Sequence, residues 1–294
     1  MPSKRSILIT GCSDGSLGAA LALQFHKAGW RVFASARNPA KLKHSVSAGI
    51  ETVLLDTLSD DSIQACVAEV EKLTGGSLDA LINNAGGGYS MPLMDIEIQK
   101  GRDLFELNVW SLITVTRAFL PLLMESTHDD GALLIMHTSI SGVVTSTGPF
   151  AGCYNASKAA ASSLTETLRL ELEPFGIRVI NLVTGAVQST FHDNAPHPTL
   201  PPNSLYNVAK KEVESAMVNE QVEHDTDANV WAKDVVKDMS KRRPALWIWR
   251  GRLALNAWIA TFCPIGSFDG MMKRWVGLDV VEKNWKQQQK SVSG

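Results

Sequence analysis

Apolar runs of strand length alternate with helix-length segments through the first two-thirds of the chain. The apolar runs occupy residues 6–10, 31–36, 52–56, 79–83, 132–137 and 178–183. The segments between them that read as helices are residues 17–28, 59–73, 104–124 and 153–173. Strands that are apolar along their whole length are buried on both faces, and such strand–helix alternation is typical of βαβ units. The sequence therefore predicts an α/β fold with one doubly wound parallel sheet and helices on both faces.

The last third of the chain has a different composition. Residues 192–203 are rich in proline and are expected to form no regular structure. A helix is expected from about residue 225 to 240, and a strand near residues 245–249 is followed by an aromatic and apolar stretch. Because no second core is evident, residues 1–294 are predicted to form a single domain. Residues 192–294 would supply a substrate loop and a C-terminal lid within it.

Charge and cysteine content exclude several classes of function. The formal net charge is −2, and no basic tract is present, so no nucleic-acid partner is expected. The four cysteines are widely separated, which argues against a disulfide framework or a zinc site, and the histidines form no metal-binding motif. The first residues contain no apolar signal-peptide core. These features favour a cytoplasmic protein without a metal.

A glycine-rich segment follows the first predicted strand and opens the first predicted helix. It reads Thr-Gly-Cys-Ser-Asp-Gly-Ser-Leu-Gly over residues 10–18. Glycines let the backbone turn sharply and approach a pyrophosphate, and the free N–H groups of a helix N-terminus favour that anion. The segment therefore predicts a Rossmann-type dinucleotide site, although a plain turn is the alternative. The candidate cofactor-binding residues are Gly11, Ser13, Gly15, Leu17 and Gly18.

The end of the second strand bears on the choice of cofactor. A site for NAD usually has an acidic residue there to hold the ribose hydroxyls, but this chain has Arg37. The planar guanidinium can pair with a 2′-phosphate, so we expect NADP(H). The alternative is that Arg37 is an ordinary solvated arginine. Asp14 in the glycine-rich segment would oppose a phosphorylated ribose if its side chain pointed that way.

Tyr154 and Lys158 lie four residues apart at the start of a strongly helical segment. Residues at this spacing share one face of a helix. A lysine ammonium there would lower the pKa of the tyrosine and make it usable as an acid or base for an alcohol/carbonyl pair. The pattern is common, and taken alone it more often marks a pair on a helix surface.

The order of these motifs resembles the short-chain dehydrogenase/reductase family over roughly residues 6–191. The resemblance implies that Tyr154 is the general acid/base, that Lys158 tunes it and holds the nicotinamide ribose, and that Asn108 helps to anchor a proton-relay water. It also implies that Asp56 contacts the adenine side of the cofactor, with Asn84 near a ribose. The further cofactor-binding candidates are Val187 and Ser189, after the sixth strand.

Two serines compete for the position that orients a substrate carbonyl. Ser139 lies three residues before Gly142, as in the family motif, and a longer loop over residues 145–150 would accommodate it. The usual separation from the tyrosine would instead select Ser141. We favour Ser139.

The chain also departs from the family pattern. The glycine segment is one residue longer, and the sixth strand ends in Thr184-Gly185 where Pro-Gly is usual. These departures place the local cofactor contacts in question, but not the chemistry. Within the family, the chain resembles the fungal 1-acyldihydroxyacetone-phosphate reductase-like branch. That resemblance implies an NADPH-dependent reductase acting on a hydrophobic ketone. A dehydrogenase or reductase of secondary metabolism is the alternative, and a catalytically silent cofactor-binding scaffold is a third.

The aromatic stretch before the C-terminus has two interpretations. It is too short to span a membrane, but its aromatic side chains and the basic residues around it suit a peripheral contact with a lipid surface, at the endoplasmic reticulum or lipid droplets. A lid packed over the substrate is the competing interpretation. The apolar faces of the 104–124 and 153–173 helices would suit a homodimer, although core burial explains them equally well.

Overall fold

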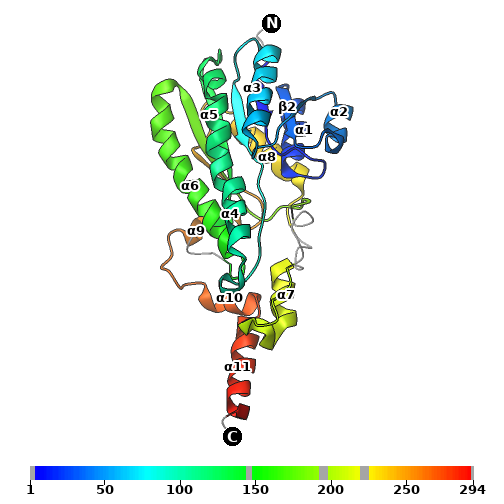
Figure 1. Cartoon of the computed structure of the whole chain (residues 1–294). Coiled ribbons are helices and arrows are strands. Elements are labelled where there is room, and N and C mark those ends of the chain that lie inside the picture. The colour runs from blue at the N-terminus through cyan, green and yellow to red at the C-terminus, as the bar shows by residue number, and fades with distance from the viewer. Residues whose placement is uncertain (1–3, 144–147, 192–197, 219–224, 293–294) are drawn as a thin grey trace.

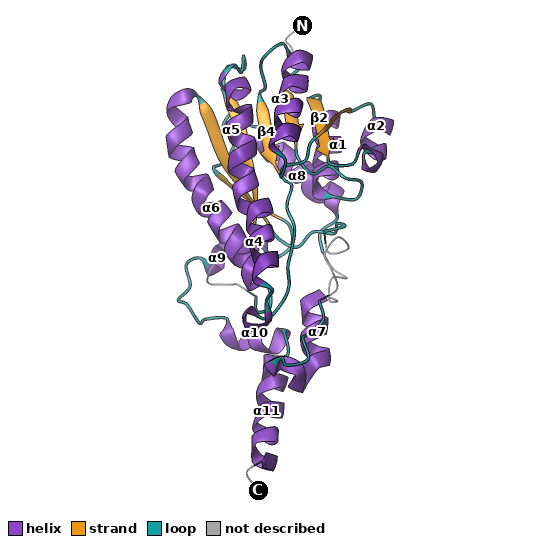
Figure 2. Ribbon diagram, viewed as in Figure 1, coloured by secondary structure: helices purple, strands orange, loops and turns teal. Residues whose placement is uncertain are grey.

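The computed structural model describes residues 4–143, 148–191, 198–218 and 225–292. Its centre is a seven-stranded sheet in the order β3-β2-β1-β4-β5-β6-β7, and every neighbouring pair is parallel (Figure 2). The order reverses between β1 and β4, as in a doubly wound sheet, so the predicted fold class is confirmed. The strands are β1 Ser6–Ile9, β2 Arg31–Ala36, β3 Glu51–Leu54, β4 Ala80–Asn83, β5 Ala132–Ser139, β6 Ile177–Thr184 and β7 Trp247–Arg250.

Helices cover both faces of the sheet. One face packs against α1 (Leu17–Lys27) and α8 (Ala228–Met239), where Phe25 and Trp231 are fully buried. The other packs against α3 (Asp60–Thr74), α5 (Ser111–Met124) and α6 (Gly152–Leu172), around Phe119. The central strands supply buried side chains to both layers, which explains why they are apolar at most positions.

The helix expected at residues 104–124 begins earlier than its sequence suggests. It comprises α4 (Ile98–Phe105), the π-helical turn η3 (Glu106–Trp110) and α5 in direct succession. Its first turns are mostly polar and contain Gly101, so they lie outside the apolar run that marked the helix. A Cβ at Gly101 would lie 3.4 Å from Cys153 Sγ, which shows how closely α4 approaches α6. By length and composition, the helix over residues 98–124 could cross a membrane. Half of its most apolar window is buried inside the protein.

The C-terminal segment returns to the sheet and then leaves it. The expected strand near residues 245–249 is β7, the edge strand beside β6. Residues 198–204 contain no helix or strand, as expected, whereas 192–197 lie outside the described residues. The shorter elements are η1 Pro39–Lys41, α2 Lys43–Ser47, η2 Leu93–Asp95, η4 Ile140–Gly142, η6 Glu173–Phe175, η7 Leu205–Ala209, α7 Lys210–Val218, α9 Ala254–Ala260, α10 Asp269–Trp275 and α11 Leu278–Val292.

The elements α7, α10 and α11 lie beyond one end of the sheet, and α11 projects away from it (Figure 1). A small apolar cluster holds this part together. It joins Val213 and Met217 of α7 to Val276, before α11, and to Phe150, before α6. Because Phe150 and its neighbour Met91 belong to loops of the sheet-bearing body, the C-terminal extension shares its packing with that body.

Candidate active site

The glycine-rich loop joins β1 to α1 at the carboxyl edge of the sheet. Gly11 and Gly15 have φ angles of 72° and 80°, in the left-handed region that favours glycine. Gly18 has no room for a side chain, because a Cβ there would lie 2.5 Å from Gly11 O. Ser16 caps α1 by accepting a hydrogen bond from Ala19 N. The loop and the helix N-terminus fit the pyrophosphate of a dinucleotide, with Ser13 and Leu17 in the same turn.

Asp14 does not extend freely from this loop. Its carboxylate accepts hydrogen bonds from Lys43 N and His44 N, each at 3.1 Å, at the start of α2. The carboxylate that would oppose a phosphorylated ribose is therefore hydrogen-bonded to the start of this short helix. Arg37, directly after β2, is exposed.

Asp56 and Asn84 follow β3 and β4, as predicted. Asp56 Oδ1 accepts from Leu58 N at 3.1 Å. The Asn84 side chain is engaged inside the protein: its amide nitrogen donates to Thr10 O at 2.7 Å and to Gly11 O at 3.2 Å. The side chain of Asn84 therefore fixes the glycine-rich loop.

Tyr154 lies in the first turn of α6, beside the end of β5. Ser139, the last residue of β5, lies beside its side chain and favours the ionised tyrosine by hydrogen bonding. Burial raises the pKa of Tyr154, and the hydrogen bond from Ser139 opposes this rise. The structure therefore joins the tyrosine to Ser139 rather than to Ser141, whose backbone N–H donates to Ser139 Oγ at 3.1 Å. The expected longer loop lies partly outside the described residues.

Lys158 is buried one turn further along α6. Its ammonium donates to His137 O at 3.0 Å and lies 5.9 Å from the centre of the Tyr154 ring. Burial lowers the pKa of Lys158 to about 8. The expected lowering of the tyrosine pKa by Lys158 is not observed, because burial of Tyr154 dominates and raises this pKa. An ammonium has three donors, so Lys158 keeps capacity for further acceptors.

Asn108 sits in the π-helical turn η3 and is buried. Its amide nitrogen donates to Gly87 O at 2.9 Å and to Ser157 Oγ at 3.0 Å, and its oxygen accepts from Gly87 N at 2.9 Å. The residue therefore ties the turn after β4 to α6. A π-turn widens the helix at this point, a distortion that is frequent at functional sites.

The segment after β6 closes onto the glycine-rich loop. Thr190 N donates to Gly15 O at 3.1 Å, and the Phe191 ring lies 5.6 Å from the Tyr154 ring. Val187 and Ser189, the two cofactor candidates here, are partly buried. The contact of Phe191 with Tyr154 was not predicted from the sequence. The two residues are 37 positions apart, and no local pattern marks a loop aromatic residue that will contact a distant tyrosine.

His137 is the second residue that the sequence analysis missed. Its Nδ1 lies 2.8 Å from Asn84 Oδ1 and its Nε2 lies 2.7 Å from Thr184 Oγ1. A signal was available, since a histidine inside a strand that is apolar on both faces needs polar partners.

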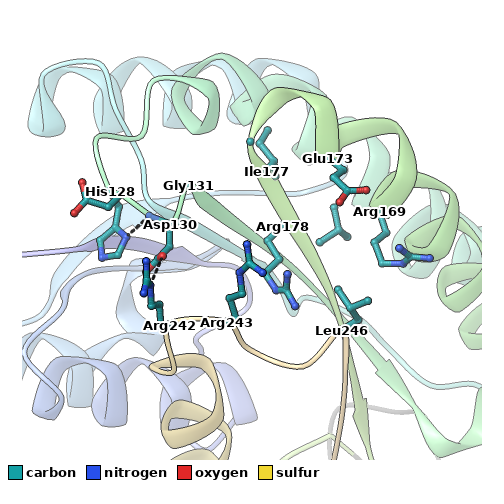
Figure 3. Close-up of a pocket in the computed structure, with 13 residues that line it drawn as sticks. His128, Asp130, Gly131, Arg169, Glu173, Ile177, Arg178, Arg242, Arg243 and Leu246 are labelled. Carbon is teal, nitrogen blue, oxygen red and sulfur yellow. Dashed lines mark hydrogen bonds and ion pairs between the residues drawn. The ribbon is translucent and has the colours of Figure 1, made fainter.

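A hollow of about 880 Å³ lies at the opposite edge of the sheet, where β5 and β6 begin (Figure 3). Arg178 and Arg243 lie near its centre, and Arg242 pairs with Asp130. A smaller hollow of about 300 Å³ reaches Ser139 and is also lined by Trp247 and Thr261. The C-terminal segment therefore lies close to the end of β5, whereas the larger hollow is remote from Tyr154.

Comparisons with known proteins agree with this arrangement. Residues 5–199 match the family model described as short chain dehydrogenase. A short-chain dehydrogenase/reductase of Pestalotiopsis microspora is 44% identical over 285 residues, covering 96% of this chain and 97% of the relative. The NADPH-dependent 1-acyldihydroxyacetone phosphate reductase of Schizosaccharomyces pombe is 37% identical, covering 70% of this chain and 69% of the relative.

Among solved structures, a short-chain dehydrogenase from Streptomyces avermitilis superposes with a TM-score of 0.76 at 26% identity, covering 94% of this chain and 98% of that one. Fold, motif order and sequence similarity coincide over the part of the chain that carries the glycine-rich loop and Tyr154. The chain belongs to the short-chain dehydrogenase/reductase family.

Proposed function

We propose that the protein is an NADP(H)-dependent oxidoreductase that interconverts a ketone and a secondary alcohol on a hydrophobic substrate. The observation that carries the proposal is the cluster of Tyr154 with Ser139, which lowers the pKa of the tyrosine, beside the buried ammonium of Lys158. The three side chains stand at the same edge of the sheet as the glycine-rich loop. A dinucleotide held by that loop is thus directed toward the tyrosine.

Each residue has a distinct task in this proposal. The cofactor, when bound, supplies or accepts the hydride. Tyr154 donates a proton to the carbonyl oxygen during reduction, and Ser139 hydrogen-bonds the same oxygen as negative charge develops on it. Lys158 places a positive charge near the tyrosine and offers donors to the cofactor ribose. Because burial raises the pKa of Tyr154, the side chain is protonated at neutral pH, which is the form that reduction requires.

The preference for NADP(H) rests on the end of β2. Arg37 is exposed there, where its planar guanidinium can meet a 2′-phosphate, and Asp14 is occupied by the start of α2. The Schizosaccharomyces pombe relative is named as NADPH-dependent, which supports the same choice.

The substrate class follows from the apolar surroundings of Tyr154. Phe191 packs against the tyrosine, and an apolar side chain there favours a hydrophobic ketone. A lipid ketone agrees with the name of the Schizosaccharomyces pombe relative. A ketone of secondary metabolism is the second candidate.

The direct experiment measures NADPH consumption by the purified protein with long-chain and small ketones, beside the variant Tyr154→Phe. The variant should lose nearly all turnover and still bind NADPH, since it lacks only the hydroxyl that transfers the proton. A variant that retains a comparable turnover number would show that Tyr154 is not the acid/base. An unmodified protein that binds NADPH and reduces nothing would instead favour the silent scaffold.

We also propose that the protein forms a homodimer through the faces of η3 and α6 that remain exposed. Trp110 and Leu170 are large apolar side chains on these elements, and both are exposed. Sedimentation of the unmodified protein and of Leu170→Glu tests this pairing. A monomer at all concentrations would contradict it.

A further inference from the structure

His137 places an imidazole inside the apolar layer between the sheet and α8. Its neighbours on the same face of β5, Leu133 and Ile135, are aliphatic and buried. The ring stacks on Trp231 of α8, with 5.4 Å between the centres and an angle of 20°. A buried polar ring of this kind is costly unless both nitrogens are hydrogen-bonded.

Both nitrogens have partners, and the partners determine which one carries the proton. Asn84 Nδ2 donates to the carbonyl oxygens of Thr10 and Gly11, so Asn84 Oδ1 is the atom that faces His137. Since Oδ1 can only accept, His137 Nδ1 must donate. His137 Nε2 then accepts from the hydroxyl of Thr184. The result is a directed chain from Thr184 through His137 and Asn84 to the glycine-rich loop.

The chain crosses the carboxyl ends of four strands, β6, β5, β4 and β1. Thr10 extends it, because its hydroxyl accepts from Asn84 N and Ala85 N, each at 2.9 Å. The backbone carbonyl of His137 also receives the ammonium of Lys158 at 3.0 Å. A single residue therefore contacts the lysine through its main chain, and Asn84 and the end of β6 through its side chain. Asn84 in turn holds the glycine-rich loop.

We propose that His137 is a positioning residue that holds the glycine-rich loop, the turn after β4 and the Thr184-Gly185 turn in register for the nicotinamide cofactor. This inference rests on the proposed function, because it assigns the chain of hydrogen bonds to cofactor binding. The imidazole takes no part in proton transfer: burial, with Lys158 nearby, lowers the pKa of His137 to about 3 and keeps the ring neutral. Its role requires a hydroxyl at position 184, where the family usually has proline.

The first test reads the tautomer directly, without cofactor or substrate. Nitrogen NMR of the histidine side chains should show one ring with Nδ1 protonated and Nε2 unprotonated, unchanged between about pH 6 and 9. The signals should disappear in His137→Phe, which keeps a ring against Trp231. A His137 ring that is protonated on Nε2, or that titrates in this range, would overturn the directed chain.

The second test separates positioning from packing. Thr184→Val removes the donor to Nε2, whereas Thr184→Ser keeps it, and NADPH affinity is read from the fluorescence of the bound cofactor. The valine variant, like His137→Phe, should bind NADPH about tenfold more weakly, whereas the serine variant should stay within about twofold. At saturating NADPH, the turnover number of the valine variant should change less than the affinity does.

Ser6→Ala is the matched control, because Ser6 Oγ donates a buried hydrogen bond to Asp79 Oδ2 at 3.0 Å near the amino end of β1. It should lower the melting temperature and leave NADPH affinity unchanged. If both His137→Phe and Thr184→Val bind NADPH normally, or if Ser6→Ala weakens binding equally, His137 is only a packing residue. If the unmodified protein binds neither NADPH nor NADH, the proposed function fails, and the positioning role fails with it.

Discussion

The side chain of Ser139 lies beside Tyr154 at the junction of β5 and α6 and lowers the pKa of the tyrosine. This contact makes Ser139 the serine that can share a carbonyl oxygen with the tyrosine. We therefore expect Ser139→Ala to lower the turnover number by about 100- to 1000-fold, as loss of an oxyanion donor does. Steady-state kinetics with an accepted ketone measure the effect.

Ser141→Ala is the matched control for that experiment. Ser141 contributes its backbone N–H to Ser139 Oγ, and alanine keeps that group. The control should retain most of the turnover. A larger loss at position 141 than at position 139 would place Ser141 in the catalytic role.

Arg37→Ala should raise the dissociation constant of NADPH far more than that of NADH. A hydrogen bond to a charged group contributes roughly 1.5–3 kcal/mol, and only NADPH has the 2′-phosphate that would receive it. Titration calorimetry with both cofactors gives the comparison, and Arg242→Ala, at the other edge of the sheet, controls for loss of a positive charge. Equal affinity of the unmodified protein for both cofactors would refute the assignment.

Lys158→Met should abolish turnover and yet stabilise the ligand-free protein below about pH 8. Burial lowers the pKa of Lys158 from 10.5 to about 8, so the folded state loses this proton before the unfolded state does. Below both values the buried ammonium costs on the order of 3 kcal/mol, and the cost disappears as the pH rises from about 8 to 10.5. Chemical denaturation of both proteins across this range measures the difference.

The stabilisation by Lys158→Met should thus be greatest at neutral pH and shrink as the pH rises. Comparing the two proteins at each pH removes the contribution of other titrating groups. A difference that stays constant, or that grows with pH, would contradict the lowered pKa of Lys158.

The tail after β7 carries exposed apolar side chains, and we propose that it makes a weak, peripheral contact with anionic lipid surfaces. Phe262 and Ile265 are 74% and 82% exposed, and Lys273 and Arg274 follow in α10. Aromatic rings suit a membrane interface, and each basic residue near it contributes about 1 kcal/mol. The variant with Phe262→Glu and Ile265→Glu should bind anionic vesicles more weakly in a flotation assay at low salt.

The fold should tolerate these tail substitutions, since both side chains are exposed, and an unchanged melting temperature checks this. Leu73→Glu, an exposed leucine at the end of α3, is the control for a change in net charge. If the unmodified protein does not bind anionic vesicles, the proposed membrane contact is wrong. The tail would then be interpreted as a lid, because Thr261 lines the hollow beside Ser139 together with Trp247.

The sequence alone determined the architecture and singled out the residues to which we assign the chemistry. Strands buried on both faces are mostly apolar, so β1 to β6 could be recognised from short windows of sequence. The glycine-rich loop, Tyr154 and Lys158 depend on local backbone conformation and on helical spacing, which a sequence also displays. The edge strand β7 was expected near its observed position, because an apolar run follows a helix there.

Only the tertiary structure decided which polar side chains meet. Asn84 was expected to lie near a cofactor ribose, and its side chain is hydrogen-bonded to Thr10, Gly11 and His137. Asp14 accepts hydrogen bonds from the first backbone N–H groups of α2, and the Phe191 ring contacts the Tyr154 ring. The start of α4 at Ile98 was also missed, because its first turns are mostly polar and precede the apolar run of the helix.

The physical reason is the range of the interactions. Periodicity, capping and turn chemistry act over a few residues, so they leave a trace in the local sequence. The hydrogen bonds of His137 join positions 53 and 47 residues away, and they exist only because β4, β5 and β6 lie side by side. A buried histidine in a strand indicates that polar partners exist, but the order of the strands determines which residues these partners are.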